Sequence, residues 1–234
     1  MKKIIVFSII SAMIIGSFGL AMAQTKNSIR QEFEAKRTEA KNLMESKKEE
    51  FKNKVEAKRE EAKSRIEAKK AELKGKLTKI KDERKKQIVE RVYNQINELN
   101  ERRLDHFSAV LEKLEKVLDR ISNRAAKAEV NGRDISAVKT AITEATNSIA
   151  LSRTAIQNQV GKVYTPVINT ENTLKTDIGK IRQALHSDLA GVQETVKIAR
   201  EAVRKAATTL AQIPKFDELE VATSTTATTT QPAQ

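Results

Sequence analysis

The sequence predicts an all-α protein in which a long N-terminal helix, amphipathic and of coiled-coil type, leads into an antiparallel three-helix bundle and a disordered C-terminal tail. An eleven-residue repeat early in the chain and heptad-like apolar spacing later in it are typical of helices. Aromatic residues, which favour strands, are scarce, at 3% of the 234 residues. The chain has no Cys, which excludes a disulfide framework and a Cys-ligated metal site.

Residues 1–23 have the pattern of a signal peptide. Two lysines precede an apolar run from Ile4 to Leu20, and Ala21-Met22-Ala23 provides a small-residue cleavage site. We therefore expect an exported protein, whether periplasmic, cell-surface or secreted. The alternative is that residues 4–23 remain as a membrane anchor, because about 20 apolar residues can span a bilayer. Basic residues are more frequent after this segment than before it, which favours the anchor and would place the rest of the chain in the cytoplasm.

An apolar residue recurs every eleven positions from residue 33 to residue 121. Eleven residues make three turns of 3.67 residues each, so the repeated position stays almost in line along a helix. We expect one helix from about Asn27 to Glu129, about 150 Å long. Gly75 is its weakest point, and we expect any bend to lie between Gly75 and Gln87. The stripe predicted to pack on another helix consists of Phe33, Met44, Phe51, Val55, Ile66, Leu73 and Leu77.

The positive charge of the chain is concentrated in the same region. Residues 26–87 contain 22 basic and 13 acidic residues, a net charge of +9 out of +13 for the whole chain. In each repeat a pair of basic residues flanks the apolar stripe, an arrangement that suits a helix lying on an anionic membrane interface. The residues that we expect to contact an anionic surface are Lys36, Arg37, Lys47, Lys48, Lys58, Arg59, Lys69 and Lys70.

The partners left open by this pattern are an anionic membrane or cell-wall polymer, and a protein partner or a second copy bound through the helices. Nucleic acid is disfavoured, because no aromatic residues alternate with the basic ones to stack on bases.

From about residue 88 the apolar stripe widens to about three residues in every seven, which is typical of a bundle helix. Asn131-Gly132 predicts a turn, Asp134 an N-cap and Gly161 a helix end. Thr165-Pro166 predicts the start of the last helix. The expected organisation is an extended basic helix at 24–87, a three-helix bundle at 88–213 with helices at about 88–129, 134–162 and 166–213, and a disordered Thr/Ser/Ala-rich tail at 214–234.

The eleven-residue pattern of Lys, Glu and Ala resembles that of exchangeable apolipoproteins, of the stalk formed by rotary ATP synthase b subunits and of group-3 desiccation-protection proteins. The resemblance is one of period and composition, and it covers about residues 1–87. It implies lipid contact in the first case and a membrane-anchored stalk in the second. It does not extend to residues 88–213, so we assign no family.

No motif in the sequence predicts catalysis or a cofactor. Glycine-rich phosphate loops, nucleophile elbows and metal-binding motifs are absent. His106 is expected to be a structural residue at the edge of the stripe. His186, Ser187 and Asp188 are adjacent on a predicted helix and therefore point in different directions, so they cannot form a proton relay.

We expect a non-enzymatic, exported structural or interaction protein of a bacterial-type cell envelope, without cofactor or metal. The three-helix bundle would hold the long basic helix away from itself, or the helix would fold back on the bundle as a fourth layer. The alternatives are a membrane-anchored coiled-coil stalk and a lipid- or client-binding periplasmic module of chaperone type.

Overall fold

The structure is a computed structural model that describes residues 26–213, with the backbone alone for residues 26–30, 32–34, 36, 37 and 40. The predicted signal segment and C-terminal tail lie outside these residues. The described chain is all-α, which confirms the predicted fold class. Its elements are α1 (Lys26–Leu77), α2 (Glu83–Val130), α3 (Ser136–Val160), the one-turn 3₁₀ helix η1 (Glu171–Thr173) and α4 (Leu174–Ala211).

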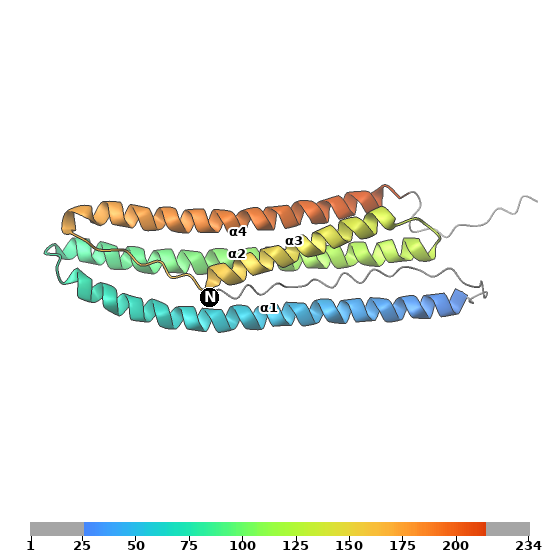
Figure 1. The fold of residues 1–234 in the computed structure, drawn as a ribbon, viewed down its shortest axis with the longest axis horizontal. Coiled ribbons are helices and arrows are strands. Elements are labelled where there is room, and N and C mark those ends of the chain that lie inside the picture. Colours follow the sequence, from blue (N-terminus) through green and yellow to red (C-terminus); the bar gives the residue numbers. More distant parts are fainter. Residues whose placement is uncertain (1–25, 214–234) are drawn as a thin grey trace, which may run out of the picture.

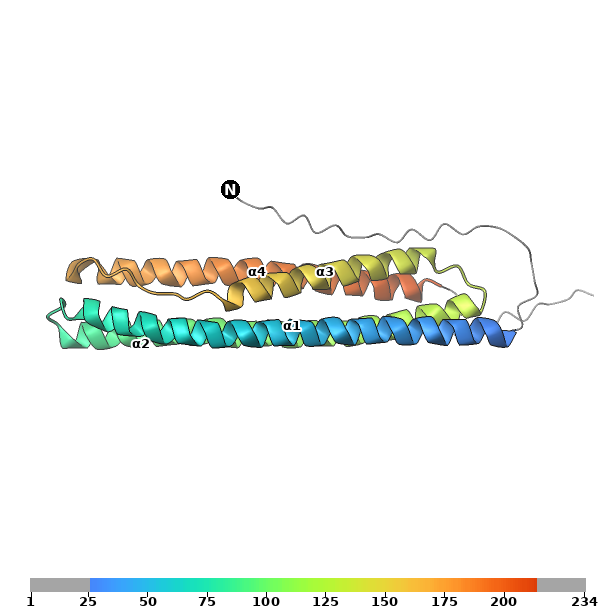
Figure 2. The same ribbon diagram turned by 60° about the horizontal axis from the view of Figure 1, so that its bottom comes forward.

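The four helices run alternately up and down in an elongated bundle (Figure 1). They form two layers, with α1 beside α2 in one and α3 beside α4 in the other (Figure 2). No helix between residues 26 and 213 is long and apolar enough to cross a membrane.

The expectation of one continuous helix from about residue 27 to 129 is wrong. α1 ends at Leu77, α2 begins at Glu83, and the chain reverses so that α1 lies antiparallel along α2 (Figure 1). The break does fall inside the interval from Gly75 to Gln87 in which a bend was expected. Folding back removes the second half of the apolar stripe of α1 from water, whereas a continuous rod would leave it exposed.

Local hydrogen bonds explain why the reversal occurs at residues 78–82. The Thr78 hydroxyl donates to the backbone carbonyl of Gly75 at 2.7 Å, which closes the end of α1. The Asp82 carboxylate accepts from the backbone N–H groups of Arg84 and Lys85 at 2.9 and 3.2 Å, and so caps the first turn of α2. Ile80 is buried beneath the turn and anchors it to both helices.

The turn from α2 to α3 follows the sequence signals. Gly132 has a φ of 79°, a left-handed conformation that glycine adopts without steric cost. The N-cap of α3 is Ile135 and not Asp134, so that prediction is one residue off, although the Asp134 carboxylate accepts from the backbone N–H of Ser136 at 2.8 Å. α3 then ends at Val160, with Gly161 as its C-cap.

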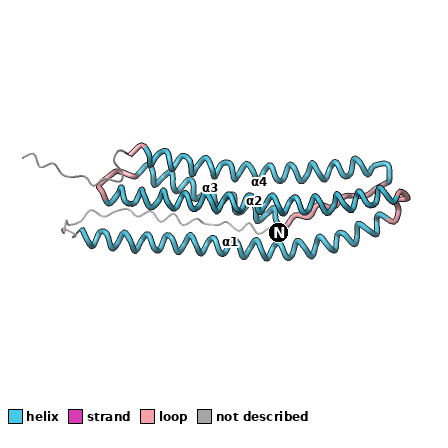
Figure 3. Tube along the Cα trace, turned by 180° about the vertical axis from the view of Figure 1, so that it is seen from behind, coloured by secondary structure: helices cyan, strands magenta, loops and turns pink. Residues whose placement is uncertain are grey.

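The predicted start of the last helix at Thr165-Pro166 is wrong, because α4 begins only at Leu174. Residues 162–170, here called the strap, run alongside α2 from the end of α3 to the start of η1 (Figure 3). Tyr164 and Pro166 on the strap are buried. The burial of these two side chains, and bonds from α2 to the Tyr164 backbone, favour an extended chain over a helix here.

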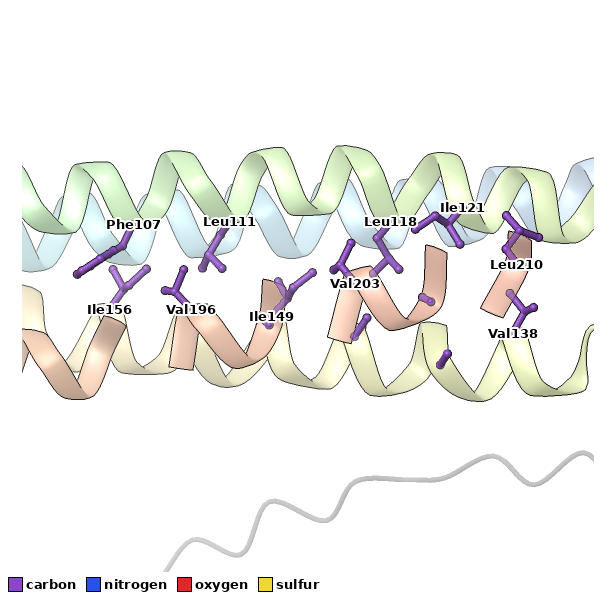
Figure 4. Packing of buried hydrophobic residues seen from close by; sticks show 14 of the residues in the cluster. Phe107, Leu111, Leu118, Ile121, Val138, Ile149, Ile156, Val196, Val203 and Leu210 are labelled. Atoms are coloured by element: carbon purple, nitrogen blue, oxygen red, sulfur yellow. The ribbon is translucent and has the colours of Figure 1, made fainter. Parts of the chain in front are cut away.

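The main core lies where α2, α3 and α4 run together, and side chains from all three helices point into it (Figure 4). A smaller cluster closes the end of the bundle at the α1–α2 turn and includes Leu73, Leu77 and Tyr93. Among the α1 residues whose side chains are described, few are buried for a helix of 52 residues, and these lie in its second half. They are Val55, Ala62, Leu73 and Leu77.

Candidate interaction surfaces

The predicted packing stripe of α1 contacts the chain itself. Val55 lies in the main core, and Leu73 and Leu77 are almost fully buried, at 1% and 2% exposed. Phe51 and Ile66 are half-buried and pack against the same two clusters. Met44 is also half-buried, and the side chain of Phe33 is not described. The second half of the stripe is therefore covered by α2 and α3.

Two of the predicted anionic contacts serve instead to hold α1 in place. The Lys58 ammonium donates to the backbone carbonyl of Gln157 on α3 at 2.9 Å. Arg59 forms an ion pair with Asp105 on α2. Both residues flank the apolar stripe, so when the stripe faces the bundle their charged ends meet the neighbouring helices rather than a membrane.

The other predicted contacts on α1 differ in exposure and in pairing. Lys69 is exposed and pairs with Glu72 at 2.7 Å. Lys47 is exposed, whereas Lys48 and Lys70 are half-buried. The side chains of residues 36 and 37, the predicted pair Lys36 and Arg37, are not described.

The α1–α2 turn carries the densest positive charge of the described chain. Residues 69–86, here called the basic hairpin, contain nine basic and three acidic residues and so have a net charge of +6. Side-chain hydrogen bonds from Lys69 and Lys76 lower the pKa of Glu72 to about 2. The Lys85 ammonium pairs with Glu171, at the start of η1, at 2.7 Å. Every acidic residue of the basic hairpin thus already has a basic neighbour within it.

Several basic side chains of this hairpin have no such neighbour. Lys74, Lys79 and Arg84 are exposed, and their side chains pair with no group in residues 26–213. The sequence-based choice of residues missed these three, because it took one basic pair from each repeat. The run Lys79–Lys86, with five basic residues in eight, was the available signal.

Beside the basic hairpin, a buried polar network fixes the strap to α2. The Asn97 side chain donates to the backbone carbonyls of Tyr93 and Tyr164 at 2.9 and 3.1 Å, and accepts from the backbone N–H of Tyr164 at 3.0 Å. The Tyr93 hydroxyl donates to the backbone carbonyl of Ile66 at 2.7 Å and so links α2 to α1.

The hydroxyl of Tyr164 continues this network to α3 and α4. It accepts from the Gln159 amide at 2.7 Å and donates to Asp188 at 2.6 Å. Burial, together with the bond to Asp188, raises the pKa of Tyr164 well above its ordinary value. Burial alone would raise the pKa of Asp188, but hydrogen bonds from Tyr164 and Lys162 leave it below its usual range. A raised pKa keeps the Tyr164 phenol protonated at neutral pH, so it remains a hydrogen-bond donor to Asp188 and is suited to holding the strap.

A second internal charge pair joins three helices in the main core. Arg153 on α3 pairs with Glu115 on α2, and both side chains are mostly buried. The Arg153 guanidinium also lies 5.4 Å from the centre of the Phe51 ring on α1, within the range of a cation–π interaction. Burial raises the pKa of the Glu115 carboxyl, and Arg153 offsets this only in part.

The described residues contain no group of three or more His, Cys, Asp or Glu side chains that could hold a metal ion. Asp188 faces the strap, where it bonds to Tyr164 and Lys162, whereas the neighbouring His186 lines a groove between α2 and α4. His106 lies on the surface of α2 against the Phe107 ring.

No family model, curated protein or solved structure matches this chain.

Proposed function

We propose that this chain is a non-enzymatic interaction protein of the cell envelope, in which a helical bundle presents its basic hairpin to an anionic surface. The observation that carries the proposal is the net charge of +6 on residues 69–86, with three exposed basic side chains that have no partner within the described chain. The surface would be one that carries phosphate groups, as phospholipid headgroups or as a cell-wall polymer. The export pattern of residues 1–23 supports a location in the envelope.

Physical considerations favour a cooperative electrostatic contact. The basic residues of the hairpin lie within one short turn and the helix ends beside it, so an extended anionic surface would meet several of them at once (Figure 1). Fixed like charges at this density raise the local potential and attract polyanions, an effect that salt screens.

The mode of binding would be peripheral. Leu77 and Ile80, the apolar residues nearest the turn, are buried at 2% and 3% exposed, so the hairpin offers them to the bundle and not to a lipid phase. An insertion through the α1 stripe would require α1 to leave α2 and α3. We therefore assign the contact to the charges of the hairpin and not to the stripe.

Vesicle co-sedimentation tests this function. The full chain should sediment with vesicles that contain phosphatidylglycerol, should stay in solution with pure phosphatidylcholine, and should be released by salt. The variant Lys74→Gln, Lys79→Gln, Arg84→Gln should lose most of this binding, because it removes the unpaired charges.

The matched control is Lys113→Gln, Lys116→Gln, Arg204→Gln, which removes three exposed charges from the other half of the bundle. It should retain binding to the anionic vesicles. Equal loss in both triple variants would mean that net charge alone matters, and binding that persists in high salt would contradict a purely electrostatic contact. Either result would overturn the proposal.

A further inference from the structure

An apolar groove runs between α2 and α4 in the half of the bundle nearest the α1–α2 turn. It has two parts, of about 450 and 660 Å³, which share Val92 and Arg182. Its apolar lining includes Ile96 and Phe107 from α2 and Leu185 from α4. Two of its large apolar side chains remain exposed to solvent, Ile88 at 51% and Leu99 at 37%. They are eleven residues apart, and thus on one face of α2.

Residue size explains why the groove occurs in this half only. Where α2 and α4 share the main core, α4 presents Ala199 and Ala206, both fully buried, and these small side chains allow the helices to approach closely. Nearer the turn, α4 presents the larger side chains of Leu185 and Leu189 to α2. α3 ends at Val160, and the strap that continues from it contacts α2 at Asn97 and α4 at Asp188 (Figure 3). Ile88 and Leu99 lie on the opposite face of α2 from Asn97, and that face is left uncovered.

The charges along the groove are almost all positive. Arg103 lies at one end, Arg182 in the middle, and Lys85 and Lys175 at the end nearest the turn. Arg103, Arg182 and Lys175 pair with no side chain in the described part of the protein. The one acidic residue that lines the groove, Glu171, is already paired with Lys85 at 2.7 Å.

We propose that this groove binds an acidic amphipathic helix of a protein partner. Apolar side chains of such a helix, spaced by three and four residues, would cover Ile88 and Leu99, and its carboxylates would pair with Arg103, Arg182 and Lys175. From Lys85 to Arg103 is 18 residues of α2, about 27 Å, which is the length of an 18-residue helix.

The distribution of charge disfavours two other occupants. A fatty acid carries its charge at one end, whereas the groove has basic residues at both ends and in the middle. The groove is also open along its length, and a small lipid is better retained by an enclosed site. A second copy of the chain that bound groove to groove would place the two sets of basic residues against each other, which is repulsive.

The probe that tests the proposal is a fluorescent 18-residue peptide with Leu at every third or fourth position and Glu on either side of them. A comparison peptide carries Lys in place of every Glu, and a third has the acidic composition in scrambled order. Fluorescence anisotropy with the full chain should show that the acidic amphipathic peptide binds at least about tenfold more tightly than the other two.

Matched variants place the binding in the groove. Leu99→Asp and Arg182→Glu should each weaken binding of the acidic peptide about tenfold. The controls Ile198→Asp and Lys180→Glu change exposed residues on the opposite face of α4, and should leave binding within about twofold. The basic-hairpin triple variant should also retain binding, which separates this site from the anionic-surface contact.

Three outcomes would overturn the proposal. One is equal binding of the acidic and basic peptides, and another is equal weakening by groove and control variants. The third is a groove that binds labelled oleate, or that forms a dimer dissociated by Leu99→Asp, while the acidic peptide does not bind.

Discussion

Replacing Asn97 by alanine tests how the strap is held against α2. The Asn97 side chain is buried at 6% exposed and bonds to both backbone polar groups of Tyr164, at 3.0 and 3.1 Å. Alanine leaves the N–H and the carbonyl of Tyr164 without these partners. Loss of the Asn97 bond to the Tyr93 carbonyl matters less, because that carbonyl also accepts a hydrogen bond within α2.

The magnitude follows from these two orphaned groups. A buried backbone group without a partner costs about 1–3 kcal/mol. A cavity of about 490 Å³ between α1 and α2 is lined by Asn97, and water from it would reduce the cost toward the lower end of this range. Alanine also gains about 0.6 kcal/mol of helix propensity over asparagine. The free energy of unfolding should therefore fall by about 1.5–2.5 kcal/mol.

Urea denaturation followed by circular dichroism measures this change, and amide hydrogen exchange at Tyr164 reports the strap directly. The matched control is Asn94→Ala, one turn away on α2 at an exposed position, which should be neutral or slightly stabilising. The reasoning is refuted if the two variants differ by less than about 0.5 kcal/mol, or if exchange at Tyr164 is unchanged in Asn97→Ala.

Two further predictions concern the end cluster and the strap tyrosine. Leu77→Ala should lower the free energy of unfolding in urea by about 2–5 kcal/mol, because it removes a buried side chain at the α1–α2 turn, whereas Leu43→Ala, at 55% exposed, should change it by less than about 0.5 kcal/mol. Burial and the bond to Asp188 raise the pKa of Tyr164 in the folded state, so above about pH 10 the unfolded chain binds fewer protons than the folded one. Stability should therefore fall as the pH rises above about 10, and Tyr164→Phe should show a smaller fall in the same titration by urea denaturation; an identical pH dependence would contradict the role given to this tyrosine.

The sequence predicts what depends on local pattern. The period of the apolar stripes is enough to identify the helices, and Asn131-Gly132 with Asp134 is enough to place the turn before α3. These signals act through neighbouring residues, so no knowledge of the rest of the fold is needed to interpret them.

Features that depend on distant residues could not be predicted in this way. An apolar stripe on residues 33–77 is compatible with an open rod and with a folded-back helix. The N-cap at Asp82 lies in a run of charged residues that is also compatible with a continuous helix. Thr165-Pro166 is a good local start for a helix, but the bonds that hold Tyr164 in the strap come from Asn97, 67 residues away.

The candidate surfaces also combine features that local sequence predicts with features that depend on distant residues. The sequence locates the basic region correctly, but whether Lys58 and Arg59 meet solvent or another helix depends on where α1 packs. The groove likewise could not be predicted from the eleven-residue repeat, since Ile88 and Leu99 occupy the same repeat position as the buried Val55 and Leu77. Ile88 and Leu99 are exposed because no other helix of the described residues covers their face of α2.

The bundle depends on α1 folding back along α2, and one distance between these helices reports this packing. Lys52 on α1 lies near Glu112 on α2, with 4.0 Å between the ammonium and a carboxylate oxygen. In a continuous rod the 60 residues between these positions would span about 90 Å. Because the chain has no Cys, a donor and an acceptor dye can be attached to Lys52→Cys and Glu112→Cys without competing sites.

Energy transfer should be almost complete, and it should persist when the labelled chain is refolded with an excess of unlabelled chain. Transfer close to zero would show that α1 points away from the bundle. Transfer that disappears in the presence of unlabelled chain would show that α1 packs on another copy, and either result would rule out folding back of α1 within one chain.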